Sequence, residues 1–375
     1  YWTQLGHEGD IKAGDLVTNP DHAKALRLIA KHGADAFYKG EIAEAIVSLM
    51  QEHGGPITKQ DMAGYKPRVM KPIVGEFRGH AVYSMPPPSS GGIAMQQMFG
   101  LLERRLDEIG ELSRDNPLYT HLLTETMKHA FADRAEWLAD SAFVDVPVER
   151  LLSDEYLDEL AARISMSHTG KKFDYGSTAP PPNDGGTSHF SVIDSNGMAV
   201  ACTETINLTF GSKVIVPGFG FALNNEMDDF TTIPGQPNAF GLQQSDRNLP
   251  QPGKRPLSSM SPTIIVKEGK VILICGAAGG PRIITSTAQC LLNCMLFDMN
   301  AGEASRAPRI HHQWMPEVLN IEARWSNQAV LSAMEAQGHV VMQSGHVGVA
   351  NLIQVTSDGI HAASDPRRGG TPSGY

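Results

Sequence analysis

The chain has 375 residues, of which 41% are hydrophobic and 19% are charged, so it can bury a large core in one or two domains. Its net charge of −10 and the lack of any Lys/Arg cluster argue against a nucleic-acid-binding surface. The sequence contains no apolar run of about 18 residues, the length that a membrane-spanning helix needs.

Two further features concern the start of the chain and its cysteines. The sequence begins at Tyr1 with neither a Met nor a signal peptide, so we expect that residues are missing upstream. The four cysteines include no C-x-x-C pair, and we interpret them as buried apolar side chains rather than metal ligands or disulfides. Cys290 and Cys294 are expected on one face of a helix.

The first half of the chain is expected to be mostly helical. Asn19 as the N-cap, Pro20 at the first helical position and Gly33 beyond the end predict one helix. A second amphipathic helix stops at Gly54, and Thr58–Asp61 resembles a capping box that opens a third. The other elements predicted here are strands at 72–77 and 80–85 and helices at 93–106, 118–138 and 148–164.

The second half is expected to be rich in strands. Residues 167–186 are rich in Ser, Pro, Gly and Lys and indicate an exposed linker, after which residues 187–271 are typical of strands and turns. Helices gathered in one half and strands in the other predict an α+β fold rather than alternating βαβ units. Beyond the linker, the ranges predicted are strands at 261–267, 270–275, 318–322, 340–344, 350–356 and 359–363 and helices at 282–297 and 326–337.

A β-hairpin is predicted directly after the linker, because "SHFSVID" and "MAVACTETI" flank an Asn-Gly turn. A two-residue loop at Asn196–Gly197, or the same loop moved by one residue, places Thr187 opposite residue 204 or 206. Thr205 therefore lies beside Thr187 or one place away, and Asn207 follows closely. The sequence predicts two threonine hydroxyls at the open end of this hairpin.

Thr187 is a candidate nucleophile because of what precedes it. A Thr hydroxyl needs a base, and the α-amino group of the same residue can serve once the preceding peptide bond has been cut. The Gly-rich segment ending at Gly186 would let the Thr187 oxygen reach the preceding carbonyl, so that the acyl group shifts from N to O and water releases it. The alternative is an ordinary junction between a loop and a strand.

Three other motifs carry polar groups suited to a substrate. The "NNEMDDF" stretch at Asn224–Phe230 could hold an ammonium group, although it could also be a solvated acidic turn, and it lacks the spacing of an EF-hand. Ser258 and Ser259 can donate to a carboxylate or form a polar turn. The glycines of "GAAGGPRIITS" follow an apolar strand and expose N–H groups suited to an oxyanion, without the spacing of a nucleotide-binding loop.

Together and in this order, the motifs resemble the γ-glutamyltranspeptidases, or glutathione hydrolases, of the N-terminal nucleophile hydrolase superfamily. The resemblance covers essentially the whole chain and rests on "GDLVTNPDHAKALRLIAKHGADAFYKG", "YSMPPPSSGG", "TSHFSVIDSNGMAVACTETINLTFGS", "LNNEMDDF", "KRPLSSMSPTIIV", "AAGGPRIIT", "RIHHQW" and "ASDPR". It implies a four-layer αββα sandwich made as a precursor and cut between Gly186 and Thr187. Residues 1–186 would be the C-terminal part of a large subunit, residues 187–375 the small subunit, and both would form one structural domain.

The resemblance also implies roles for individual residues. Thr187 would be the nucleophile, its freed amine the general base, and Thr205 the residue that orients the Thr187 hydroxyl. The N–H groups of Gly279 and Gly280 would form the oxyanion hole. The remaining implied residues are Asn207, Glu226 and Asp229 for the α-amino end of a γ-glutamyl group, Ser258 and Ser259 for its α-carboxylate, and Phe240 at the tip of a lid loop.

The implied activity transfers the γ-glutamyl group of glutathione or related amides to Thr187, and then to water or to an amino-acid or peptide acceptor, with no cofactor or metal. One alternative is a glutaryl or cephalosporin acylase, which the acidic pair Glu226 and Asp229 disfavours. Another is an inactive remnant, because the family's large subunit normally extends upstream of Tyr1 and there carries an Arg for the α-carboxylate. The resemblance further implies a periplasmic or extracellular location.

Overall fold

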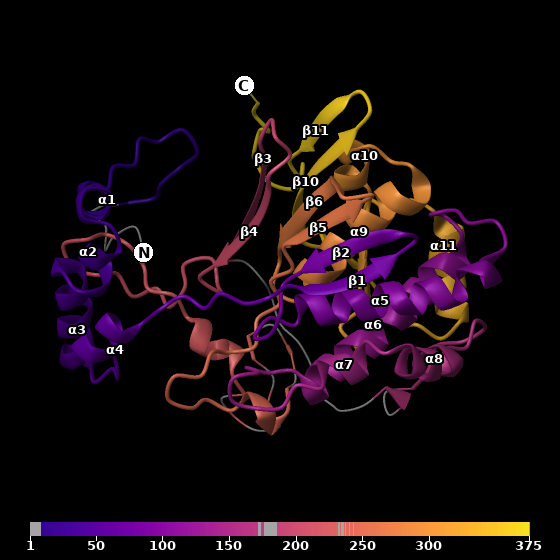
Figure 1. Cartoon of the computed structure of the whole chain (residues 1–375), viewed down its shortest axis with the longest axis horizontal. Coiled ribbons are helices and arrows are strands. Elements are labelled where there is room, and N and C mark those ends of the chain that lie inside the picture. Colours follow the sequence, from indigo (N-terminus) through magenta and orange to yellow (C-terminus); the bar gives the residue numbers. More distant parts are fainter. Residues whose placement is uncertain are drawn as a thin grey trace. The chain divides into compact units, whose positions relative to one another are not determined.

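The helices and strands of the computed structural model fall into two units, and Figure 1 gives their labels. The structure describes residues 9–171, 174–175, 186–231, 233, 236, 238–239, 241–242 and 244–374. The first unit is Tyr1–Met70 with Leu208–Asn225, and the second is Lys71–Asn207 with Glu226–Tyr375. Among the described residues, no helix combines the length and apolar character that crossing a membrane requires.

Among its described residues the first unit has four helices, and the caps predicted for three of them are confirmed. Asn19 accepts a hydrogen bond from the His22 N–H, Gly54 adopts the left-handed conformation, and Thr58–Asp61 forms a reciprocal capping box. Ile42 and other apolar side chains of these helices pack with residues of the Leu208–Asn225 segment. The helices are α1 (Pro20–His32), α2 (Ala34–Tyr38), α3 (Glu41–His53) and α4 (Lys59–Gly64).

A six-stranded antiparallel sheet forms the centre of the second unit, in the order β1-β2-β5-β6-β10-β11. In the middle of the sheet, a strand that precedes Thr187 in the sequence pairs with one that follows it. These strands are β2 and β5, and Ser84 of β2 lies opposite Thr263 of β5. The strands are β1 (Ile73–Phe77), β2 (His80–Ser84), β5 (Thr263–Lys267), β6 (Lys270–Ala278), β10 (Val349–Thr356) and β11 (Gly359–Ala363).

Two neighbouring residues of β6 show what covers each face of this sheet, since successive side chains on a strand point to opposite faces. Cys275 is fully buried near Cys290 of α9 (Arg282–Phe297), which packs on β6. Gly276 faces the hairpin β3–β4, because a Cβ there would lie 2.3 Å from the ring of His189. Helices α5 (Gly91–Arg105) and α6 (Pro117–Trp137) pack together, and α5 also packs on β1 and α9 (Figure 1). Helices, sheet and hairpin therefore form successive layers, and the predicted α+β class is confirmed.

The register of the hairpin differs from both predicted registers. Strands β3 (Thr187–Ile193) and β4 (Ala199–Thr205) pair Thr187 directly with Thr205. The loop is longer than a two-residue turn, because Asp194 pairs with Met198 and Gly197 takes a φ of +84°. The prediction of a two-residue loop was wrong, and the prediction of adjoining threonines is confirmed.

The rest of the second unit contains shorter elements. The single helix predicted at 148–164 was wrong, because Ser153 caps a new helix and divides the segment. The strands predicted across 187–271 are likewise interrupted by a largely irregular stretch after Asn207. The elements are α7 (Val148–Leu151), α8 (Asp154–Arg163), α10 (Ala301–Arg306), β7 (Ile310–His311), β8 (Leu319–Glu322), α11 (Gln328–Ala336), β9 (Val341–Ser344) and the 3₁₀ helices η2 (Leu106–Ile109), η4 (Glu226–Asp229) and η5 (Asp246–Asn248).

Candidate active site

The centre of the candidate site is the open end of the β3–β4 hairpin. Thr187 is only 5% exposed, and its Oγ1 lies 3.0 Å from Oγ1 of Thr205. The Thr205 hydroxyl also accepts a hydrogen bond of 2.9 Å from the N–H of Asn207, which has a φ of +71°. Asn tolerates this left-handed conformation better than most residues. The turn at Asn207 thus locks the Thr205 hydroxyl beside Thr187.

The carbonyl that precedes Thr187 is held by the same hairpin. The Gly186 carbonyl oxygen accepts a hydrogen bond of 3.3 Å from the N–H of Ile206. Predicted linker residues 172–173 and 176–185 lie outside the described residues. Gly186 and Thr187 are therefore placed by strand pairing, whatever precedes them.

Two glycines follow β6 near Thr187. Gly279 has a φ of +144° and Gly280 a φ of +52°, conformations that favour glycine over residues with a Cβ. They directly precede Pro281 and the N-terminus of α9, where the helix dipole is positive. Each glycine shares a cavity with Thr187, which is the position that an oxyanion hole for a Thr187 ester would need.

A narrow cavity of about 20 Å³ gathers most of the predicted substrate-binding residues. Its polar walls face Thr187 and come from segments far apart in the sequence, and Leu242, Met260 and Ile283 supply apolar surface. The predicted residues that line it are Thr187, Thr205, Asn207, Asp229, Ser258, Ser259 and Gly280. Phe240, the predicted tip of the lid loop, lies outside the described residues.

Two of the three acidic residues of η4, Glu226 and Asp229, are electrostatically coupled. Burial, reinforced by the charge of Glu226, raises the pKa of Asp229 to about 8, while Arg134 acts in the opposite direction. Burial also raises the pKa of Glu226 to about 6, against the effect of a hydrogen bond from Thr205. Near neutral pH, the two carboxyls therefore titrate as a pair rather than as independent groups. A bound ammonium group would stabilise their ionised forms.

The loop before α5 fixes the position of the predicted serine pair. The N–H and the hydroxyl of Ser90 both donate to the Ser258 carbonyl at 2.8 Å, and the Ser258 N–H donates to the Pro88 carbonyl at 2.8 Å. The sequence pattern "PPPSSGG" indicated only a break between elements. Its function in the fold is to hold the segment that carries Ser258 and Ser259.

Asn248 is a site-supporting residue that the sequence analysis missed. It is fully buried, and its Nδ2 donates to the Asp229 carbonyl at 2.7 Å. Its Oδ1 accepts from the Leu257 N–H at 3.1 Å. Asn248 therefore joins the acidic segment to the serine segment across an irregular region, where no periodic pattern could indicate it.

Arg134 is the second residue that the sequence analysis missed. It lies on α6, is 1% exposed, and donates from Nε to the Ser90 hydroxyl at 3.0 Å and from Nη2 to the Ser259 hydroxyl at 3.5 Å. Buried residues surround almost the whole circumference of α6. The helix consequently lacks the polar face that would make a buried cation stand out in the sequence.

A wider cavity, of about 260 Å³, also reaches Thr187. Gly186 and Gly279 contribute to its wall, and Arg282, His346 and Arg368 bring basic groups. Its described lining residues include no Asp or Glu. Thr187 thus lies where a narrow cavity with acidic and hydroxyl groups meets a wider cavity with basic groups.

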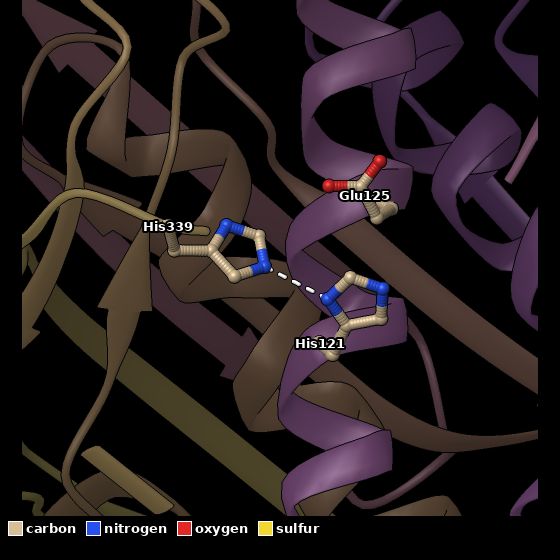
Figure 2. Close-up of side chains that lie close together, drawn as sticks. All are labelled: His121, Glu125 and His339. Carbon is tan, nitrogen blue, oxygen red and sulfur yellow. Dashed lines mark hydrogen bonds between the residues drawn. The ribbon is translucent and has the colours of Figure 1, made fainter. Parts of the chain in front are cut away.

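A second polar cluster, away from Thr187, lies between α6 and His339, which follows α11. Figure 2 shows His121, Glu125 and His339, whose ligand atoms lie within 4.8 Å of one another, close enough for one metal ion. The two imidazoles share a hydrogen bond of 2.8 Å, and Glu125 accepts hydroxyl hydrogen bonds from segment 165–175. The Lys128 ammonium lies 3.7 Å from the Glu125 carboxylate and supplies the positive charge that balances it. We therefore assign this cluster to anchoring Thr169 and Tyr175.

Comparisons with known proteins indicate the family to which the chain belongs. The model of the family described as "Gamma-glutamyltranspeptidase" matches residues 1–375. The chain is 44% identical to a glutathione hydrolase proenzyme of Escherichia coli (strain K12) and 37% identical to the acylase ACY 1 proenzyme of Pseudomonas sp. (strain SE83). Each alignment covers 96% of this chain and 62% of the relative, so the chain spans about three fifths of their length.

Similarity to solved structures bears on the fold. A crystal structure of cephalosporin acylase from Bacillus halodurans matches with a TM-score of 0.81 and 26% identity, covering 98% of this chain and 65% of that chain. This similarity confirms the predicted fold of the N-terminal nucleophile hydrolases. Together with the family match over all 375 residues, it leads to one conclusion: the chain belongs to the gamma-glutamyltranspeptidase family.

Proposed function

We propose that the protein is a γ-glutamyl hydrolase and transferase that cleaves the γ-glutamyl amide bond of glutathione and related compounds. The observation that carries the proposal is the position of Thr187. It is the first residue of β3, its hydroxyl lies 3.0 Å from that of Thr205, and it borders both cavities. A nucleophile there has an acyl-binding pocket and a separate space for the departing amine.

The first proposed reaction is self-cleavage between Gly186 and Thr187. The Thr187 hydroxyl attacks the Gly186 carbonyl, the C–N bond breaks, and an ester to Thr187 Oγ1 replaces the peptide bond. Water then hydrolyses the ester, which releases the Gly186 carboxylate and restores the hydroxyl. The products are a large and a small subunit, and the small subunit begins with the free amine of Thr187.

The residues that line or adjoin the narrow cavity are proposed to bind the γ-glutamyl group. Asp229 and Glu226, with Asn207, would bind the α-ammonium group, because buried carboxylates gain most from an adjacent cation. The hydroxyls of Ser258 and Ser259 would donate to the α-carboxylate. These contacts would place the γ-carbonyl carbon beside the Thr187 oxygen.

In the proposed turnover, the Thr187 amine removes the hydroxyl proton as Oγ1 attacks the γ-carbonyl. The Gly279 and Gly280 N–H groups stabilise the oxyanion, and the protonated amine then gives its proton to the leaving amine. Water or an acceptor amine then attacks the γ-glutamyl ester of Thr187. The same proton transfers occur in the opposite order, which releases the γ-glutamyl product and restores the Thr187 hydroxyl. The wider cavity, with Arg282 and Arg368, suits a leaving group or acceptor that ends in a carboxylate, such as an amino acid or dipeptide.

A glutaryl or cephalosporin acylase is the second candidate, because an acylase proenzyme and a cephalosporin acylase structure are among the similar proteins. Glutaryl substrates lack an α-ammonium group. They would leave Asp229 and Glu226 buried without a cation, which disfavours binding. The acidic pair therefore favours γ-glutamyl over glutaryl substrates. Family resemblance also leads us to propose a periplasmic or extracellular location.

The test combines amine release with detection of the acyl-enzyme. The full-length protein should release aniline from a γ-glutamyl anilide, and mass spectrometry of the acid-quenched reaction should find a γ-glutamyl ester on Thr187. Thr187→Ala should abolish both signals. Ser188→Ala removes an exposed neighbouring hydroxyl and should leave both unchanged. Turnover by Thr187→Ala, or faster release from a glutaryl anilide, would contradict the proposal.

A further inference from the structure

Arg134 connects to both members of the serine pair. Its Nε donates to the Ser90 hydroxyl, which in turn donates to the Ser258 carbonyl, and its Nη2 donates to the Ser259 hydroxyl. Arg134 precedes Thr187 in the sequence, whereas both serines follow it. One buried guanidinium, from the segment before Thr187, thus contacts the predicted carboxylate-binding segment after it.

The guanidinium of Arg134 lacks the compensation that other buried cations receive. Within the part of the chain that the structure describes, no carboxylate lies within 4 Å of it, and its buried Nη1 has no hydrogen-bond partner. Arg309, equally buried, pairs with Asp365 at 2.8 Å, and Lys128 pairs with Glu125 at 3.7 Å. A buried charge without a close counter-ion is costly. An anion bound nearby would offset that cost.

The electrostatic surroundings agree with this reading. Burial lowers the pKa of Arg134 to about 10, so the side chain stays cationic at neutral pH. Asp229, on the wall of the same narrow cavity as Ser259, acts on Arg134 only through space. The positive charge therefore adjoins Ser259, to which Arg134 donates, and the negative charges of Asp229 and Glu226 belong to the other group of proposed substrate contacts. This separation matches a zwitterionic end that carries both an ammonium and a carboxylate.

We propose that Arg134 is a positioning residue for the α-carboxylate of the acyl donor, acting through Ser259 and Ser90 and through its charge. The inference rests on the proposed function and adds a residue to it. Serine hydroxyls are neutral donors, and a cation that polarises them strengthens their hydrogen bonds to an anion. The segment before Thr187 would then contribute directly to donor specificity in the segment after it.

The test compares two anilides that differ only in the α-carboxylate: γ-glutamyl anilide and 4-aminobutanoyl anilide. In the full-length protein, Arg134→Met should raise KM for γ-glutamyl anilide by about 10- to 100-fold, the range expected for a charge-assisted hydrogen bond, with a much smaller change in kcat. For 4-aminobutanoyl anilide, kcat/KM should change by less than about threefold. Arg134→Lys keeps the charge and should recover part of the selectivity.

The matched control is Arg150→Met, which removes an exposed guanidinium stacked over Trp137 at the end of α6. It should leave the ratio of kcat/KM for the two anilides unchanged. An equal loss of kcat/KM on both anilides in Arg134→Met would overturn this inference but not the proposed function. If Arg134→Met does not fold, the same result in Arg134→Lys would do so. A wild-type protein that releases no aniline from γ-glutamyl anilide would contradict the proposed function and this inference with it.

Discussion

At the scale of single residues, the acidic pair of η4 sets the pH behaviour of the candidate site. Burial destabilises the ionised form of both carboxyls, so the pKa values rise to about 6 for Glu226 and about 8 for Asp229. Asp228 and Glu226 raise the pKa of Asp229, and Arg134 lowers it. Under the proposed function, the ionised pair would bind the substrate's ammonium group, so binding should strengthen as the pH rises through these two values.

The first prediction uses a ratio that cancels the titration of the Thr187 amine. The kcat/KM for γ-glutamyl anilide, divided by that for glutaryl anilide, should rise between about pH 5 and pH 8, because only the γ-glutamyl substrate carries the ammonium. In Asp229→Asn this rise should be reduced and the ratio should fall at all pH values. A ratio that does not depend on pH in the wild-type protein would contradict the assignment of Asp229.

The second prediction concerns the hydroxyl of Thr205. Thr205→Val keeps the shape of the side chain but removes the oxygen 3.0 Å from Thr187, so self-cleavage and turnover should both slow by up to about 100-fold. Thr203→Val is the control, since it lies on the same strand but bonds to His189 instead. Time courses on denaturing gels and anilide assays measure the two effects. Equal rates for the two variants would refute an orienting role for Thr205.

At the scale of elements, local signals predicted most of the regular structure. Helix α9 has the predicted range of 282–297, and the caps of α1 and α3 lie where Asn19 and Gly54 indicated. The hairpin loop was longer than predicted, because Asp194 side-chain hydrogen bonds to two backbone N–H groups favour a wider turn. Local signals specify caps and turns but do not choose among closely related loop lengths.

The candidate site was predictable only in part from the sequence. Residues on regular strands or in short polar motifs, such as Thr187 and Ser259, were identified. Arg134 and Asn248 were not, because they act through contacts between segments that are more than a hundred residues apart or through irregular loops. Such tertiary hydrogen bonds leave no periodicity and no local motif in the chain.

The third prediction concerns how the hairpin docks on the central sheet. Gly276→Ala would place a Cβ 2.3 Å from the His189 ring, so the ring or the hairpin that carries it must shift, and we expect self-cleavage to slow by at least about tenfold. Adding His189→Ala removes the obstructing ring, and the double variant should cleave at nearly the rate of His189→Ala alone. If Gly276→Ala cleaves as fast as the wild type, the close contact is unimportant for positioning Thr187.

At the scale of the whole molecule, the central sheet contains strands from both sides of the proposed cut. Strands β1 and β2 precede Thr187, and β2 forms a ladder with β5, which follows it. Helices α5 and α6 also precede Thr187, and α5 packs on α9, which follows it. Cutting the Gly186–Thr187 peptide bond would leave these contacts in place.

The fourth prediction follows from this shared sheet. After cleavage, the two fragments should elute together in gel filtration under native conditions and separate only in denaturant. Thr187→Ala, which should remain one chain, provides the reference and should elute at the same volume. Fragments that separate without denaturant would contradict the layered arrangement of strands and helices across the cut.

The central claim is that Thr187 becomes the N-terminal nucleophile of a small subunit. Its most direct test is mass spectrometry of the denatured full-length protein after purification, with N-terminal sequencing of the fragments. We predict two fragments, of which the smaller begins at Thr187, and one uncut chain for Thr187→Ala. An uncut wild-type chain that nevertheless releases amine from γ-glutamyl anilide, or a cut at any other peptide bond, would contradict the claim.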